Sequence, residues 1–458
     1  MKTNNLTEGR PLRLLLLFSL PLMAGNIFQQ MYTIVDTAVV GKVLGVEALA
    51  ALGAVDWLSW MTLGIIQGFT QGFAILMAQK FGAGEYKKLR QVITNSLLLA
   101  VICAAVLTAA SEGLAASAVS FLKTPVEIRP ICMAYIRIIF GGIPVVMAYN
   151  LAASVLRALG NGRTPLVAMV LASLTNICLD FLFVLGFGWG VQGAAAATIL
   201  AQVLSALYCI RHIGKIEILR MSRGDWKMES GLCTRLMTLG APMAFQNTVI
   251  SVGGMIVQTV VNGFGVIFIA GFTATNKLYG LLETAATSYG YAMVTYAGQN
   301  LGAGKTKRIS SGLRAGILIS MVTSVLITVM MILFGRLILG CFISSEGGSG
   351  AQALDIAYRY LFIMAIFLPV LYVLHVTRSC IQGLGNTVLP MVSGIAEFVM
   401  RTGAAFVLPM LFGENGILFA EVLAWAGADM ILIPSYFYVM GKVRQRCQEA
   451  CLVKAGEL

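Results

Sequence analysis

The feature that most constrains this chain is its succession of long apolar runs. About twelve stretches of roughly 20 residues or more carry almost no charge. A helix needs about this length to cross a hydrocarbon core roughly 30 Å thick, and runs this continuous lack the two-residue alternation of a membrane barrel. The predicted spans are 14–40, 48–79, 91–112, 132–156, 164–188, 191–212, 236–262, 266–297, 313–341, 357–381, 387–412 and 415–441.

The composition supports the same fold class. Of the 458 residues, 58% are hydrophobic and only 11% are charged, which excludes a soluble domain of this length. The net charge of +12 does not require a nucleic-acid partner, because 24 of the 32 basic residues fall on one side of the membrane if the N-terminus is cytosolic. This count includes Arg378 among the basic residues of the inner segments. The positive-inside rule then predicts a multi-pass protein of the plasma (inner) membrane with both termini in the cytosol.

Three landmarks of the first half recur in the second half, in the same direction. The recurring pairs, which keep offsets of 220 to 225 residues, are 13–21 with 235–242, 79–85 with 299–305, and 156–165 with 381–390. We therefore predict an all-α membrane protein with two six-helix lobes related by a parallel internal repeat, with a cleft between them. The predicted parts are a cytosolic N-terminus (1–13), an N-terminal lobe (14–212), a cytosolic connector (213–234), a C-terminal lobe (235–441) and a cytosolic tail (442–458).

Asp36 is the only charged side chain between Leu14 and Val40. A charge at the centre of a spanning helix costs about 2.5 to 3.5 kcal/mol on insertion scales, so such acids usually face a bundle interior or a wet cavity. Asn26, Gln29 and Thr33 share the helical face of Asp36 and extend it well inside the span. The alternative is that Asp36 merely caps the outer end of the helix.

The fifth predicted span offers a second acid on a polar face. Asn176 and Asp180 lie four residues apart, and Thr198 lies on the sixth span. Two carboxyls in one low-dielectric pocket do not both ionise cheaply, so Asp36 and Asp180 are expected to share a proton and titrate as a unit. The alternative is a purely structural hydrogen-bond network between helices.

The second lobe is polar in a different pattern. Glu283 lies deep in the eighth span and His375 in the tenth, where a lone histidine is more often a helix contact than a proton shuttle. Glu397 and Arg401, one turn apart, are predicted to form an intrahelical ion pair. Glu421 in the last span has no partner in the sequence and is a weak candidate for a functional acid.

Several motifs together resemble the multidrug and toxic compound extrusion (MATE) family. They are the 21–40 segment with Val35-Asp36-Thr37, the glycine loops at 82–84 and 302–304, the turn at 159–165 and the helix around 176–180, in the order that the family has them over roughly residues 10 to 445. The resemblance implies a twelve-helix cation-coupled antiporter that exports organic compounds, often cationic ones. The family's proton- or cation-binding residues match Asp36, Asn176, Asp180 and Thr198.

This chain departs from part of that family. Sodium-coupled branches place a carboxylate on the seventh span, where Gln246 and Asn247 stand here. The coupling ion is therefore predicted to be H⁺, with Na⁺ at Asp36, Asn176 and Asp180 as the alternative, and no other cofactor or metal is expected.

The predicted function is secondary active efflux of organic cations by alternating access. Substrates are expected to be small, amphipathic and organic, in a protein that works as a monomer within the lipid bilayer. Enzyme activity is not expected, because no nucleophile stands beside a base at a recognisable spacing. The alternative is a flippase for lipid-linked precursors, which should carry several cationic side chains in its cleft. The candidates to line a drug cleft are Gln29, Met31, Tyr32, Tyr149, Met255, Tyr279, Glu283 and His375.

Overall fold

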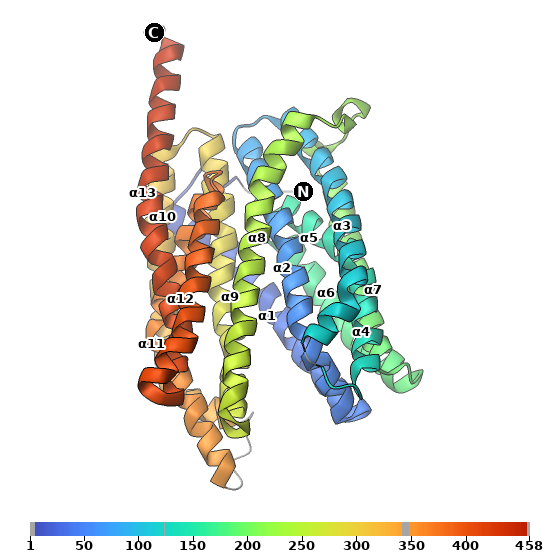
Figure 1. Ribbon diagram of the computed structural model, residues 1–458. Helices are drawn as coiled ribbons and strands as arrows, with labels where there is room; N and C mark the ends of the chain where they lie inside the picture. The colour runs from blue at the N-terminus through green and yellow to red at the C-terminus, as the bar shows by residue number, and fades with distance from the viewer. Residues whose placement is uncertain (1–4, 123, 341–347, 456–458) are drawn as a thin grey trace. The chain divides into compact units, whose positions relative to one another are not determined.

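The computed structural model of the chain describes residues 5–122, 124–340 and 348–455, and these ranges contain helices and no strand (Figure 1). Four short 3₁₀ turns and one π-helical turn, η1 (Phe181–Gly186), join the longer elements. The 3₁₀ turns are η2 (Glu217–Leu219), η3 (Arg223–Trp226), η4 (Asn262–Phe264) and η5 (Gly413–Phe419). The α-helices are α1 (Pro11–Leu44), α2 (Val46–Gly82), α3 (Tyr86–Phe121), α4 (Arg129–Gly141), α5 (Ile143–Ala158), α6 (Arg163–Asp180), α7 (Gly190–Ile213), α8 (Ser230–Val261), α9 (Val266–Gly302), α10 (Thr306–Gly340), α11 (Gly348–Gly383), α12 (Val388–Phe412) and α13 (Ala420–Ala455).

The helices match the predicted spans one for one when α4 and α5 count as one bent span. In the described chain, nine stretches, or ten with the bent pair, are long and apolar enough to cross a membrane. One of the nine, Val388–Glu449, covers α12 and most of α13. Among the long helices, α9 is not apolar enough to count as a membrane span. The reason is its polar content, which includes Asn276, Lys277 and Glu283. The all-α membrane architecture is thus confirmed.

Two spans are less regular than the sequence indicated. The run predicted at 132–156 bends by 45° between α4 and α5. Gly142 stands at the bend, and Pro144 follows in the first turn of α5. The lack of an N–H on proline costs no hydrogen bond there, because first-turn N–H groups have no partner within the helix. The run predicted at 164–188 is α-helical only to Asp180, after which η1 widens the helix. π-turns of this kind occur frequently at functional sites.

The chain forms two compact units whose bounds differ from the predicted lobes. Unit 1 contains Leu20–Thr248, and unit 2 contains Leu6–Ser19 together with Val249–Leu458. The first turns of α1 therefore group with the second half of the chain, and the first half of α8 groups with the first half. A proline, Pro21 or Pro242, lies close to where each of these helices changes unit.

Close packing against α2 explains why the first half of α8 belongs to unit 1. A Cβ at Gly68 would lie 2.4 Å from the Ala244 Cα, and one at Gly72 would lie 2.4 Å from the Gly240 Cα. Asn247 Nδ2 also donates a hydrogen bond to the Gly64 carbonyl at 2.8 Å. Small residues spaced by four allow the backbones of two membrane helices to come into contact. Inside a membrane no hydrophobic effect drives helices together, so such close van der Waals packing stabilises their association.

The internal repeat is visible in the backbone of the turns. Gly84 and Gly304 both have φ 71°, and they stand 220 residues apart after α2 and α9. Gly160 and Gly385, with φ of 75° and 84°, stand 225 residues apart after α5 and α11. A left-handed conformation excludes most side chains, so these turns keep glycine in both halves. The predicted duplication is confirmed.

The connector between the halves is fixed to α3 within unit 1. The Asp225 carboxylate, 2% exposed, accepts hydrogen bonds from the backbone N–H and the hydroxyl of Ser222, both at 2.8 Å, and forms a 3.0 Å ion pair with Arg90. Asn95 donates to the Lys227 carbonyl and accepts from the Glu229 N–H. The pKa of Asp225 therefore lies below its ordinary value of 3.8, chiefly because of the Ser222 N–H and with help from Arg90.

We expect Asp225→Asn to loosen this connector. Loss of the charged hydrogen bonds lowers the free energy of opening the connector by at least about 1 kcal/mol, so the open form becomes roughly fivefold more populated. We expect protease cleavage within residues 213–229 to become faster by the same factor. Because the pKa of Asp225 is lowered in the folded chain, its stabilisation is present above pH 3.8 and is lost as pH falls through the lowered value. Glu217→Gln, at an exposed acid of the same connector, is the control and should not change the cleavage rate.

Candidate functional site

The four predicted coupling residues lie together in unit 1. Asp36 of α1, Asn176 and Asp180 of α6 are 8%, 1% and 0% exposed, and Asn176 Nδ2 donates to the Thr198 hydroxyl of α7 at 3.4 Å. α6 packs against α7. It also contacts α1, where the Ser173 hydroxyl donates to the Phe28 carbonyl at 3.4 Å.

The carboxyls of Asp36 and Asp180 are close enough to interact directly. Four buried oxygens of this group have no hydrogen-bond partner: Asp36 Oδ1, Asn176 Oδ1 and both carboxyl oxygens of Asp180. A buried acceptor without a donor costs about 1 to 3 kcal/mol, and two adjacent carboxylates repel each other. The arrangement can therefore accept a positive ion, which relieves both costs.

Two tyrosines complete this site, and only one of them was predicted. Tyr32 of α1 and Tyr135 of α4 lie within electrostatic range of both carboxyls. Tyr135 also packs on an apolar cluster of Val39, Val40 and neighbours from α2, α7 and η1. No sequence signal identified Tyr135, because its contact with α1 depends on how α4 folds back.

A narrow crevice opens beside the carboxyl pair. It is lined by Tyr32, Ala172, Asn176, Thr198, Ala201 and Gln202, and as it stands it has no room for a water molecule. Of the other candidates of this half, Gln29 makes a side-chain hydrogen bond with Tyr32 of the crevice. Gln29 is half-buried and Met31 is 56% exposed, whereas Tyr149 of α5 is buried.

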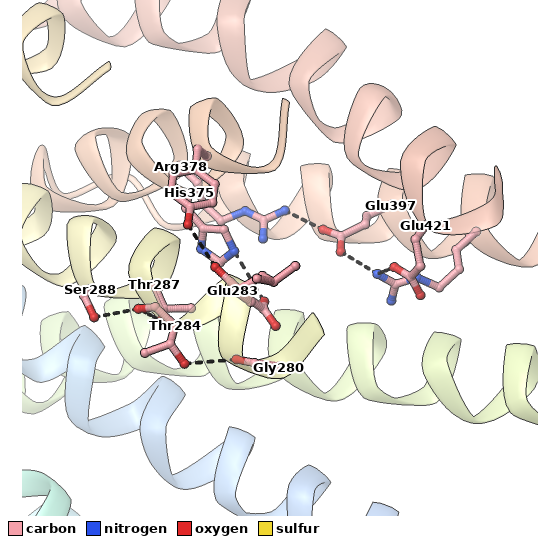
Figure 2. Close-up of polar contacts among 12 residues, drawn as sticks. Gly280, Glu283, Thr284, Thr287, Ser288, His375, Arg378, Glu397 and Glu421 are labelled. Carbon is pink, nitrogen blue, oxygen red and sulfur yellow. Dashed lines mark hydrogen bonds and ion pairs between the residues drawn. The ribbon is translucent and has the colours of Figure 1, made fainter. Parts of the chain in front are cut away.

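Unit 2 contains a buried network of two guanidinium groups and two carboxylates (Figure 2). Arg378 of α11 and Arg401 of α12 bind the two oxygens of Glu397 at 2.6 and 3.0 Å, and Arg401 also binds Glu421 of α13 at 2.8 Å. The predicted Glu397–Arg401 pair is confirmed. Arg378, which was counted with the basic residues of the inner segments, is 8% exposed within α11, and its charge is neutralised by Glu397 of α12.

Beside this network, Glu283 of α9 faces His375 of α11, with His375 Nε2 3.5 Å from a Glu283 oxygen (Figure 2). The Glu283 side chain is 35% exposed and so remains accessible. Tyr279 lies one turn before Glu283 and stacks on Trp425 with ring centroids 5.9 Å apart. Met255 of α8 is half-buried. Glu283 therefore offers a partly exposed carboxylate next to an aromatic face.

Known proteins resemble this chain along nearly its whole length. A family model described as MatE matches residues 21–182 and again residues 242–407, more than half of the chain. The probable multidrug resistance protein YpnP of Bacillus subtilis is 30% identical over 421 residues, which are 91% of this chain and 93% of that protein. The probable multidrug resistance protein NorM of Thermotoga maritima is 26% identical over 94% of this chain and 93% of its own length.

Solved structures share the fold. A crystal structure of MATE in complex with MaL6 superposes with a TM-score of 0.89 at 21% identity, covering 98% of this chain and all of that one. A MOP superfamily transporter from Pyrococcus furiosus superposes with the same TM-score at 22% identity, covering 97% of this chain and 98% of its own.

We expect Glu397→Gln to destabilise the chain strongly, because it leaves two buried guanidinium groups with a single carboxylate. Removing one partner of a buried ion pair costs about 3 to 5 kcal/mol, to be measured as a lowered midpoint of thermal unfolding in detergent. The matched control is Asp355→Asn, which breaks the exposed 2.6 Å pair with Arg336 and should cost no more than about 1 kcal/mol. Equal losses in the two variants would contradict the buried network's role.

Proposed function

Because the chain belongs to the MATE family, we propose that it is a secondary active exporter of organic cations, driven by antiport with protons across the inner membrane. The observation that carries the proposal is the pair of buried, adjacent carboxyls at Asp36 and Asp180, with unpartnered oxygens around them. The names of YpnP and NorM as probable multidrug resistance proteins support drugs as the exported compounds.

Proton exchange at the carboxyl pair would supply the coupling. With one proton bound, the pair carries a single negative charge, and the proton can bridge between the two acids. Release of that proton leaves two repelling carboxylates in a low-dielectric pocket, a state that requires either reprotonation or a rearrangement of α1 against α6. We propose that this rearrangement is the step that links ion exchange to alternating access of the two lobes.

The same oxygens also suit Na⁺, which prefers hard oxygen ligands. The oxygen ligands available to such an ion are Asn176 Oδ1 and the Asp180 carboxylate, which have no hydrogen-bond partner. We favour H⁺ because α8 has Gln246 and Asn247 where sodium-coupled branches are expected to have a carboxylate. Separately imposed pH and sodium gradients decide between the two ions.

For the substrate, we propose that Glu283 is the recognition acid in unit 2. It is the partly exposed carboxylate of the described polar cluster, and Tyr279 beside it presents a ring to which a flat cation is attracted. His375 contacts the same carboxylate and would compete with a bound cation when it is protonated. An amphipathic organic cation fits this combination.

A lipid-linked-precursor flippase is less well supported. Such a protein needs uncompensated cationic side chains to hold a pyrophosphate. Arg378 and Arg401 are buried in unit 2, but both are neutralised by Glu397 and Glu421. Vesicles that compare dye efflux with translocation of a lipid-linked precursor separate the two functions.

We expect Asp36→Asn and Asp180→Asn each to reduce pH-driven dye efflux from inverted vesicles by at least about tenfold, since the neutral amide cannot exchange a proton and tenfold corresponds to about 1.4 kcal/mol. The matched control is Asp429→Asn, at another buried membrane acid of the chain, which should keep the wild-type rate. Wild-type pH-driven efflux in Asp36→Asn, or efflux driven by a sodium gradient alone, would overturn proton coupling at this pair.

We expect Glu283→Gln to raise the KM for a cationic dye by roughly tenfold while leaving the KM for an uncharged substrate nearly unchanged, because only the cation loses an ionic partner. Glu112→Gln on α3 serves as the control for removing a membrane-helix acid. A parallel rise for charged and uncharged substrates would show that Glu283 only supports the local structure.

A further inference from the structure

The internal repeat assigns a counterpart to each residue that lines the crevice of unit 1. Pro21 and Pro242 align α1 with α8, Pro165 and Pro390 align α6 with α12, and the turn glycines Gly193 and Gly416 align α7 with α13. These two glycines are equivalent in packing as well as in sequence. A Cβ at either would collide with the segment before it, at 3.1 Å from the Phe183 carbonyl carbon and 2.4 Å from the Leu408 oxygen.

With these offsets, three of the six crevice residues correspond to members of the buried ion network of unit 2. Ala172, Asn176 and Thr198 of unit 1 correspond to Glu397, Arg401 and Glu421. The 3.4 Å contact between Asn176 and Thr198 is thus replaced by the 2.8 Å ion pair between Arg401 and Glu421. The two acids of unit 1 have uncharged, buried counterparts: Asp36 corresponds to Val257, and Asp180 to Ala405.

The counterpart of Tyr32 is Gly253, and this exchange makes room for the guanidinium. A Cβ at Gly253 would lie 3.4 Å from Arg401 Cδ and 3.5 Å from its Nη1. Three oxygens surround the guanidinium: the Ile250 carbonyl at 3.2 Å, Glu397 Oε1 at 3.0 Å and Glu421 Oε2 at 2.8 Å. A cation in an oxygen cage therefore stands where unit 1 has its crevice.

We propose that Arg401 is a covalently tethered cation that permanently fills, in the second repeat, the position equivalent to the Asn176 crevice, which in the first repeat lies beside the carboxyl pair that exchanges the coupling ion. The proposal rests on the proposed function of the Asp36–Asp180 site. Arg401 cannot leave, so this position of unit 2 carries its positive charge in every state of the transport cycle. Ion exchange is then confined to unit 1, although both units descend from one repeat.

The proposal implies a latent cation site. Removing the guanidinium leaves the Ile250 carbonyl, Glu397 Oε1 and Glu421 Oε2 without their cation, while Arg378 remains on Glu397 Oε2. Na⁺ takes oxygen ligands of this kind. The other charged groups facing this position are Arg378 of α11, which holds Glu397, and Glu283 of α9, which is paired with His375. Asp429 of α13 lies near Arg378 and Glu397. The cage would therefore carry a net negative charge.

The test measures Na⁺ binding by purified full-length protein in which Asp36→Asn and Asp180→Asn silence the first site. Thermal unfolding is followed at alkaline pH as NaCl replaces choline chloride at constant ionic strength, because an ion that binds only the folded state raises the midpoint with its concentration. The background protein should show no Na⁺-dependent rise. Adding Arg401→Gln should produce one, and adding Glu421→Gln to that protein should abolish it.

No rise in the folded Arg401→Gln protein, a rise already present in the background, or a rise that survives Glu421→Gln would each overturn the proposal. If the background protein with Arg401→Gln added does not fold, a second variant is made in the otherwise wild-type chain. It carries both Arg401→Gln and Glu421→Gln, which remove one positive and one negative charge. This pair should keep wild-type pH-driven efflux, and loss of pH drive with intact substrate exchange would refute the tethered cation. Because the Na⁺ readout does not depend on transport, failure of proton coupling at Asp36 and Asp180 is distinguishable from failure here.

Discussion

Every charge buried in the membrane-spanning part of this chain has to be compensated within the protein, because lipid and packed side chains solvate ions poorly. The two units meet this requirement in different ways. In unit 2, Glu397 and Glu421 are matched by Arg378 and Arg401, so the charges of these four groups balance. In unit 1, Asp36 and Asp180 face each other and tyrosine rings, with carboxyl oxygens that no donor satisfies. A network of matched charges holds its helices together, whereas the pair of acids in unit 1 can accept an ion from outside.

The duplication explains where the two halves agree and where they differ. Turns such as those at Gly84 and Gly304 depend on a backbone conformation that few residues besides glycine adopt, so both copies retain it. The polar side chains at the centres of the helices are less constrained than the turn glycines, because different sets of side chains can balance charge there. Asn176 and Arg401 can therefore occupy equivalent positions with opposite chemical consequences.

The sequence was sufficient for the parts of the structure that depend on local pattern. Apolar run length located the helices, turn motifs revealed the repeat, and the one-turn spacing of Glu397 and Arg401 predicted their ion pair. Contacts between distant helices were beyond it. Arg378 lies near the end of its predicted span and was counted with the inner basic residues, and its partner Glu397 lies on the next helix. The bend at Gly142 and the π-turn after Asp180 also depend on packing that no run of apolar residues reports. The adjacency of Asp36 and Asp180 was a hypothesis drawn from polar stripes, and the structure places the two acids side by side.

The difference between the units bears on how a duplicated scaffold can be driven in one direction. If both halves exchanged an ion, either could change conformation independently, and the two events would need a further mechanism to keep them in step. With the proposed tethered cation at Arg401, unit 2 has no ion to exchange at the equivalent position. Unit 2 also holds Glu283, whose partial exposure and His375 neighbour suit it to substrate rather than to the coupling ion. Under the proposed function, the asymmetry of the two polar centres is a division of labour, with ion exchange in one half and substrate recognition in the other.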